Sequence, residues 1–219
     1  MFGILLLNSA LADPHCAGPQ DVGLQTDDGA EAWLHRHPAD GPPVLVVHGV
    51  SSNHWCWDLD PDRSLATTLN AQGFDIWFID LGGHGCAERK HDGSRQAPRR
   101  SFDDYGSDDI AAAIAHIQEA TSTEQVAYIG HSMGGHVAAA YVATHGDSAL
   151  SALVVVGSPI DFEDLEPRFR LSRAGALFGS ALPALPSPWA ARMAASLQAL
   201  PFGMDQLFYA EGSISPETR

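Results

Sequence analysis

The sequence predicts an α/β fold in which helices flank a mostly parallel sheet. From residue 44 to residue 157, short apolar runs alternate with longer segments whose apolar side chains recur at helical spacing. Two of these runs, residues 44–47 and 152–156, are continuously apolar, as is typical of parallel strands with both faces covered. This alternation implies right-handed crossovers between neighbouring parallel strands.

Turn signals and apolar periodicity place the elements in order. Residues 22–26 and 30–35 are expected to form a hairpin at the sheet edge. The further strands are expected at 44–47, at 74–79, immediately before Ser132 and at 152–157, and the helices at 61–72, 102–120 and 135–145. Ser101 is the expected N-cap of the helix at 102–120.

The composition is that of a globular domain, and its charge favours neutral or hydrophobic substrates. Of 219 residues, 45% are hydrophobic and 18% are charged, so the chain can bury one sizeable core. With 27 acidic and 12 basic residues, its formal net charge of −15 argues against binding to nucleic acid or anionic membranes. No apolar run reaches the length of a membrane-spanning helix. The sequence does not indicate which oligomeric state the protein has.

The first 19 residues are interpreted as a signal-like leader and a linker. Residues 2–12 are apolar and end in Ala10-Leu11-Ala12, which is similar to the later part of a secretory signal with its small-residue cleavage site. A basic segment in front of this run is absent. Two alternatives follow: a secreted or periplasmic protein, or a cytoplasmic one with an ordinary apolar N-terminal segment.

The three cysteines, Cys16, Cys56 and Cys86, do not have the spacing of a metal site, and no metal or cofactor is expected. Cys56 and Cys86 both follow predicted strands, so a disulfide between them is conceivable in an exported protein. Free thiols in packed loops are the simpler alternative.

One pentapeptide, Gly130-His131-Ser132-Met133-Gly134, lies where a predicted strand must turn abruptly into a helix. Such a turn forces the serine into a strained conformation with its hydroxyl exposed. Glycine tolerates the crowding on either side because it has no Cβ. Ser132 is therefore predicted to be a catalytic nucleophile, and the alternative is a structural turn serine.

A serine nucleophile needs dipoles that stabilise the oxyanion formed by its attack. The backbone N–H of Met133 is the expected first donor, because it lies at the start of the helix after Ser132. The second expected donor is the backbone N–H of Val50, with His48 and Gly49 supporting its loop. Trp55 and Trp57 either line an acyl pocket or pack in the core.

These motifs together resemble the α/β-hydrolase superfamily, and within it the lipases and esterases, over about residues 20–160. The matching residues are His48-Gly49, Asp80 with Gly83-His84-Gly85, and Gly130-His131-Ser132-Met133-Gly134-Gly135. Gly82 departs from the family, in which arginine is common at this position. The resemblance implies attack of Ser132 on a carbonyl, an acyl-serine intermediate and hydrolysis of a small hydrophobic carboxylic ester. Acyl transfer, thioester hydrolysis and a non-catalytic binding protein are the alternatives.

In this superfamily the acid and then the histidine of the triad follow the serine. All eleven histidines lie at or before His145, and His136 and His145 are expected to point away from the site. Asp161 is a weak candidate for the acid, because helix capping explains it as well. The segment Ser215-Pro216-Glu217 has the residues typical of a helix start, but only two residues follow it in this sequence. We therefore expect an N-terminal portion of a longer hydrolase, inactive by itself.

The region after the last predicted strand is expected to form a helical lid or cap. Residues 160–219 are rich in apolar side chains, and prolines at 167, 183, 186, 188 and 201 divide them into short helical pieces. The predicted organisation is therefore a hydrolase core at 20–159 followed by a lid at 160–219, with the final strands of the fold missing.

Overall fold

The computed structural model describes residues 16, 18–27, 29–50, 52–88 and 101–158. The chain divides into two compact units, Met1–Ile160 and Asp161–Arg219, and all described residues belong to the first. The signal-like segment, the predicted lid at 160–219 and Asp161 lie outside the described residues and stay predictions.

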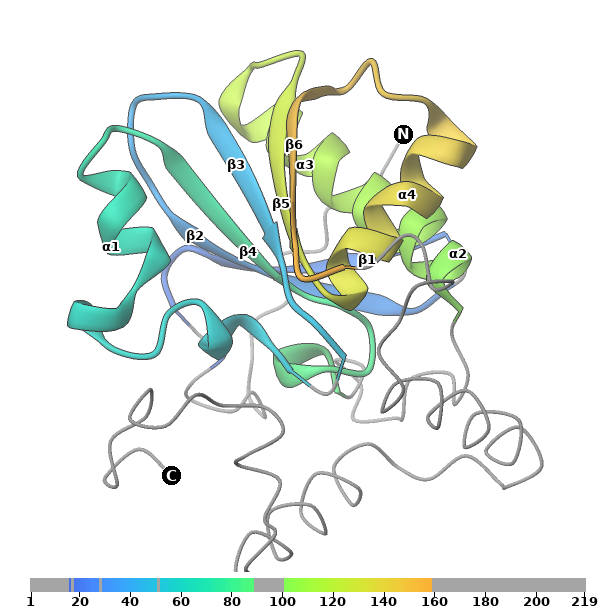
Figure 1. Ribbon diagram of the computed structural model, residues 1–219, viewed down its shortest axis with the longest axis horizontal. Helices are drawn as coiled ribbons and strands as arrows, with labels where there is room; N and C mark the ends of the chain where they lie inside the picture. Colours follow the sequence, from blue (N-terminus) through green and yellow to red (C-terminus); the bar gives the residue numbers. More distant parts are fainter. Residues whose placement is uncertain (1–15, 17, 28, 51, 89–100, 159–219) are drawn as a thin grey trace, which may run out of the picture. The chain divides into compact units, whose positions relative to one another are not determined.

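The described strands form one mixed sheet, and its parallel part carries the candidate nucleophile (Figure 1). Its order is β1-β2-β4-β3-β5-β6. The bounds are β1 Asp21–Gln25, β2 Glu31–His37, β3 Pro43–Val47, β4 Asp75–Asp80, β5 Val126–His131 and β6 Leu150–Val156. The pairs β1–β2 and β2–β4 are antiparallel, whereas β3–β4, β3–β5 and β5–β6 are parallel. The predicted sheet, including its edge hairpin, is confirmed.

The helices follow the predicted order, with one division. Their bounds are η2 His54–Cys56, η3 Pro61–Arg63, α1 Leu65–Asn70, η4 Gly85–Ala87, α2 Phe102–Asp104, η5 Tyr105–Ile110, α3 Ala111–Thr121 and α4 Met133–His145. The helix expected at 61–72 is divided, because Ser64 has extended backbone and its side chain caps α1 by accepting the N–H of Thr67. No helix among the described residues is long and apolar enough to cross a membrane.

The helix expected at 102–120 is present, but its middle is wider than an α-helix. Ser101 caps it in a reciprocal capping box with Asp104, as predicted. The segment η5 is a π-helix, and it lies against α4. A Cβ on Gly106 would lie 2.7 Å from the backbone N of Tyr141, so only glycine allows this close approach.

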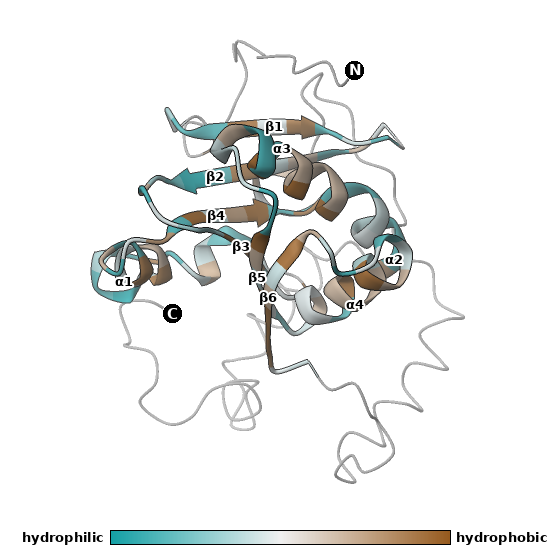
Figure 2. Cartoon of the chain, turned by 90° about the horizontal axis from the view of Figure 1, so that it is seen from above, coloured by the Kyte–Doolittle hydropathy of each residue, from teal (hydrophilic) through white to brown (hydrophobic). Residues whose placement is uncertain are grey.

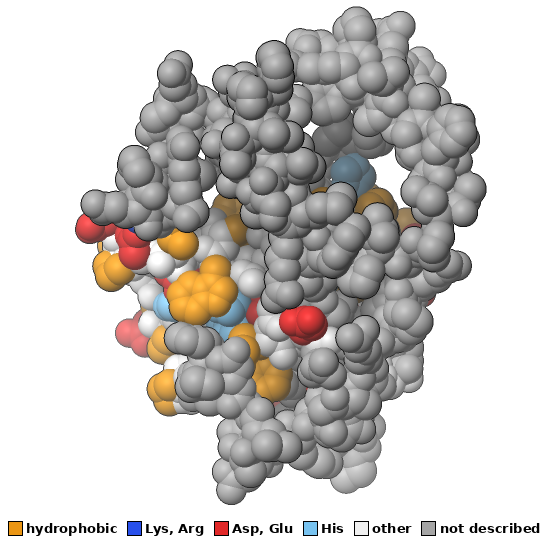
Figure 3. All heavy atoms as spheres, turned by 90° about the horizontal axis from the view of Figure 1, so that it is seen from below, with side chains coloured by type: hydrophobic (Ala, Val, Ile, Leu, Met, Phe, Trp, Pro, Cys, Tyr) orange, Lys and Arg blue, Asp and Glu red, His pale blue; other side chains and the backbone are white. Residues whose placement is uncertain are grey.

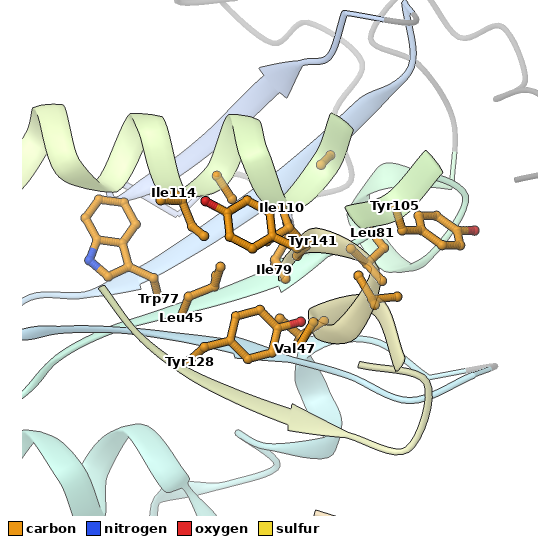
Figure 4. Close-up of a cluster of buried hydrophobic side chains, with 14 of the residues drawn as sticks. Leu45, Val47, Trp77, Ile79, Leu81, Tyr105, Ile110, Ile114, Tyr128 and Tyr141 are labelled. Carbon is orange, nitrogen blue, oxygen red and sulfur yellow. The ribbon is translucent and has the colours of Figure 1, made fainter. Parts of the chain in front are cut away.

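The sheet separates two apolar layers, because successive side chains of a strand point to opposite faces. Leu45 and Val47 of β3 pack with α3 and α4 in the larger cluster (Figure 4). Val44 and Val46 pack with α1 on the other face. Strand β3 is therefore apolar along its whole length, and Figure 2 shows most of β4 in the hydrophobic colour.

Strand β6 differs from the buried strand that its sequence predicts. It pairs with β5 on one side and lies at the edge of the described sheet. Its side chains from Leu153 to Val156 are 40–49% exposed. The apolar run is confirmed as a strand, but its burial is not, because among the described residues it has a neighbour on one side only.

The core packing predicts a contrast between two leucines. Replacing Leu45, which is fully buried, by alanine should lower the free energy of unfolding by about 2–5 kcal/mol, because it leaves a cavity. Leu59 is 46% exposed, so Leu59→Ala should change it by less than about 0.5 kcal/mol. Urea unfolding followed by circular dichroism measures both. Equal effects of the two substitutions would contradict this packing.

Candidate active site

Ser132 lies in the tight turn that joins strand β5 to helix α4. Its backbone has φ 50° and ψ −112°, a region that non-glycine residues rarely adopt and that costs about 1–3 kcal/mol. Its N–H donates to the Val156 carbonyl at 2.9 Å, and its own carbonyl accepts the hydroxyl of Ser158 at 2.7 Å. A backbone bond to β6 and a side-chain bond from Ser158 thus hold the strained residue in place.

Two glycines permit this turn. A Cβ on Gly130 would lie 2.6 Å from the carbonyl carbon of Gly134, and a Cβ on Gly134 would lie 2.6 Å from the Val47 carbonyl oxygen. Both distances are shorter than real Cβ contacts, and both involve backbone, which cannot move aside easily. The structure therefore supplies the physical reason for glycine at each position, namely the close approach of β3, β5 and α4.

The loop after β3 packs directly against Ser132. A Cβ on Gly49 would lie 3.3 Å from the Ser132 Cβ. His48 is fully buried beneath this loop; its Nδ1 lies 2.7 Å from the Gly49 carbonyl, and its Nε2 accepts the Leu81 N–H at 3.2 Å. Because Nε2 is an acceptor, the proton lies on Nδ1 and the ring is neutral. His48 thus contacts the backbone of the loop and is not placed as a base, and its support of an oxyanion loop stays a prediction.

The two predicted oxyanion donors, Met133 and Val50, directly follow the two residues in contact, Ser132 and Gly49. Met133 is the first residue of α4, so its N–H has no acceptor within the helix. Val50 follows Gly49 in the loop, and its side chain is 65% exposed. The N-terminal end of a helix also favours negative charge. The donor roles of Met133 and Val50 stay predictions that this arrangement suits.

The histidines near Ser132 contact its backbone or its neighbours. His136 was expected to point away, but its Nδ1 lies 3.1 Å from the Ser132 carbonyl oxygen, because one helical turn brings it back over the start of α4. His131 is exposed and meets the Trp57 ring edge-on at 5.9 Å. His145 stacks on Tyr141, away from the turn. Within the described ranges, no histidine nitrogen bonds to the Ser132 hydroxyl.

The aromatic residues of the loop before α1 have two different environments. Trp55 is 43% exposed and lies over the ring of His54, with ring centroids 4.8 Å apart. Trp57 packs partly against the smaller core cluster and reaches His131. Hydrophobic side chains and histidines gather on the face that Figure 3 shows. Trp57 therefore combines the two predicted roles, core packing and proximity to the site.

A buried carboxylate, Asp80, ends strand β4 below the same loops. It is fully buried and accepts the backbone N–H groups of His54 at 2.7 Å and Cys86 at 2.8 Å. It also lies 2.9 Å from His54 Nδ1 and 3.3 Å from His35 Nε2. Burial alone would raise the pKa of Asp80, but the hydrogen bonds from the two histidines hold it well below its usual range.

His35 links Asp80 to a second carboxylate. Its Nδ1 lies 3.2 Å from Asp21 and its Nε2 lies 3.3 Å from Asp80. Burial alone would lower the pKa of His35, but hydrogen bonds to both carboxylates raise it to about 9. Sequence reasoning did not find this network, because 45 residues separate His35 from Asp80. The one feature of the local sequence that pointed to this network was Asp80, directly after the strand predicted at 74–79.

The structure differs from both cysteine alternatives, a Cys56–Cys86 disulfide and free thiols throughout. Cys86 is bonded to Cys16, with the two Cα atoms 5.5 Å apart, and Cys56 is free and exposed. The η4 segment that carries Cys86 packs against β2, which lies beside β4 in the sheet. Secretion stays a prediction.

A family profile described as "alpha/beta hydrolase fold" matches residues 42–214. The chain belongs to the α/β-hydrolase family. The predicted fold and the resemblance to this family are confirmed.

The relatives of this hydrolase-family chain include lipases. It is 34% identical over 129 residues to human gastric triacylglycerol lipase, covering 52% of the chain and 32% of the lipase. It is 27% identical over 163 residues to the poly(3-hydroxyalkanoate) polymerase subunit PhaC of Allochromatium vinosum, covering 72% of the chain and 42% of that protein. The chain thus spans less than half the length of these relatives.

A solved structure agrees on the fold. A hydrolase from Pseudomonas aeruginosa PA01 superimposes with a TM-score of 0.53 at 19% identity, covering 82% of this chain and 59% of that one. At this identity the likeness shows the architecture alone, so the chemistry has to be argued from the residues around Ser132.

Burial of His48 predicts loss of stability in mild acid. Burial, and then the nearby His84, lower the pKa of His48 from 6.5 to about 4. The unfolded chain therefore takes up a proton that the folded chain refuses, so the stabilisation is complete above pH 6.5 and falls as the pH drops towards 4. By about pH 5 the loss should be about 2 kcal/mol.

Urea unfolding of the wild type and of His48→Gln across this range measures the effect. The His48→Gln variant should be less stable near neutral pH. As the pH falls from 6.5 towards 4, the slope of its free energy of unfolding against pH should be smaller than that of the wild type, by the equivalent of about one bound proton. Identical pH slopes for the two proteins would show that His48 does not titrate in this way.

Proposed function

We propose that this protein is a serine hydrolase of carboxylic esters with Ser132 as its nucleophile. The observation that carries the proposal is the backbone of Ser132, at φ 50° between β5 and α4, with Gly49 packed against its Cβ. A non-glycine residue keeps such a conformation only where the surrounding structure enforces it, and enforced strain of this kind clusters at functional sites. The kinship with lipases supports ester chemistry.

In the proposed reaction, the Ser132 hydroxyl oxygen attacks the ester carbonyl carbon as a general base removes its proton. The carbonyl oxygen becomes an oxyanion, which accepts the N–H groups of Met133 and Val50. Collapse expels the alcohol and leaves an acyl-serine, which water then hydrolyses to the acid. Among the described residues no histidine nitrogen bonds to the Ser132 hydroxyl, so the proposal assigns the role of base to none of them. Asp161 remains the weak candidate for the acid.

The proposed substrate is a small hydrophobic ester. Trp57 borders His131 beside Ser132, and Val50 and Trp55 expose apolar side chains on the adjoining loop. Apolar acyl groups gain free energy from burial against such side chains, whereas the net charge of −15 disfavours anionic substrates.

A fluorophosphonate probe, which phosphonylates activated serines, tests the nucleophile. The full-length protein, including any residues beyond Arg219, should be labelled at Ser132, and Ser132→Ala should abolish labelling. Ser122→Ala is the matched control, because Ser122 is the other described non-glycine residue with positive φ, at 55°, and it ends α3. Peptide mass spectrometry locates the label. A folded protein that takes no label at Ser132 would instead be a binding protein.

Acyl transfer on the same nucleophile is the second candidate. It is favoured by the relative from Allochromatium vinosum, which covers 72% of the chain and is named for polymerising 3-hydroxyalkanoate units. An acyl-serine partitions between water and another nucleophile, and the site decides which is used.

Product analysis separates the two reactions. Incubation with a p-nitrophenyl ester and increasing concentrations of a short alcohol should yield mainly the free acid if the protein is a hydrolase. A transferase should form mostly the new ester at alcohol concentrations far below that of water. Ser132→Ala is the control, because it should remove both products.

A further inference from the structure

Below the loop that carries His48, four side chains bring potential metal ligands together. We call these side chains, His35, His54, Asp80 and Cys86, the four-ligand cluster. Their potential ligand atoms are His35 Nε2, His54 Nδ1, Asp80 Oδ2 and Cys86 Sγ, and all four atoms lie within 4.8 Å of one another. They come from β2, η2, the end of β4 and η4. We propose that the four-ligand cluster binds one Zn²⁺ ion when reduction releases Cys86 from Cys16.

The spacing suits a tetrahedral ion after small movements. Bonds of 2.0–2.3 Å to nitrogen, oxygen and sulfur place tetrahedral ligands roughly 3.3–3.8 Å apart. Asp80 Oδ2 already lies 3.3 Å from His35 Nε2 and 2.9 Å from His54 Nδ1. Both rings therefore point their nitrogens at one place, and the carboxylate needs to withdraw by only about 1 Å for an ion to enter between them.

The surroundings support a structural metal site. The nitrogen of His35 that faces away from the cluster lies 3.2 Å from Asp21, the carboxylate–histidine arrangement that orients metal-binding imidazoles. His35, His54 and Asp80 are each at most 5% exposed. With two neutral imidazoles, one carboxylate and one thiolate, Zn²⁺ gives a site of zero net charge, which suits burial.

The disulfide decides whether the fourth ligand is available. In the structure Cys86 Sγ is bonded to Cys16 Sγ. A dithiol reductant transfers two electrons and two protons to this bond, giving two thiols, and becomes a cyclic disulfide itself. Zn²⁺ then displaces the proton of the Cys86 thiol and the Nε2 proton of the charged His35, both of which pass to water, and forms a zinc–thiolate and a zinc–imidazole bond. The oxidised protein thus has three ligands in the cluster, and the reduced protein has four.

A matched pair of variants separates this proposal from a purely structural hydrogen-bond network. Cys16→Ser and Cys86→Ser both remove the disulfide, but only Cys16→Ser leaves the Cys86 thiol in the cluster. Both are made in the full chain with Cys56→Ser, which removes the remaining thiol. Circular dichroism and cooperative urea unfolding confirm that each variant is folded.

Titration with Co²⁺, a spectroscopic substitute for Zn²⁺, reads the ligands directly. Cys16→Ser should bind one ion per chain without reductant and show intense visible bands of four-coordinate cobalt with a thiolate-to-cobalt band in the near ultraviolet. Cys86→Ser should lack the thiolate band and bind Zn²⁺ at least tenfold more weakly. Adding Asp21→Asn to Cys16→Ser should weaken binding about 10–100-fold while keeping the thiolate band.

Equal Zn²⁺ affinity of the two cysteine variants, or a six-coordinate cobalt spectrum without a thiolate band, would overturn the proposal. So would wild-type protein that binds Zn²⁺ equally with and without the dithiol reductant. These readouts do not depend on catalysis, so they stand or fall separately from the function proposed for Ser132.

Discussion

The candidate site depends on the close approach of three backbone segments. The carbonyl of Val47 at the end of β3 touches the start of α4 at Gly134, and Gly130 of β5 touches the same turn. Since side chains would separate these segments, glycine at both positions allows the strand to turn into a helix within one residue. That residue is Ser132, and its hydrogen bonds to Val156 and Ser158 lock the turn to the next part of the chain.

Asp80 organises the layer beneath this turn. A fully buried carboxylate is stable only when it is fully hydrogen-bonded, and here its donors come from β2, η2 and η4. The residue after it, Leu81, donates its N–H to His48, which in turn contacts the Gly49 carbonyl beside Ser132. Hydrogen bonds, together with the peptide link between Asp80 and Leu81, therefore join the edge hairpin to the loop that would face a substrate. His48 stays neutral in the same region where His35 is charged, because His35 faces two carboxylates.

The fold alone does not select a reaction. The family includes proteins named for hydrolysing triacylglycerols and one named for polymerising hydroxyalkanoates. What these reactions share is an acyl group and a nucleophile, and the arrangement around Ser132 suits both. Strand β6, whose side chains from Leu153 to Val156 are exposed, adjoins the turn itself, because the Val156 carbonyl accepts the Ser132 N–H.

The local sequence determined the six strands, their alternation with helices and the turn at Ser132. These features follow from hydrophobic period and from glycine, whose effects extend over a few residues. It did not reveal that Ser64 divides a helix or that His136 returns to the Ser132 carbonyl, since both depend on exact backbone geometry. Only the tertiary structure decided the Cys16–Cys86 pair and the contacts of His35 with Asp80. The reason is spatial strand order: β2 pairs with β4, so residues distant in sequence meet where no local pattern connects them.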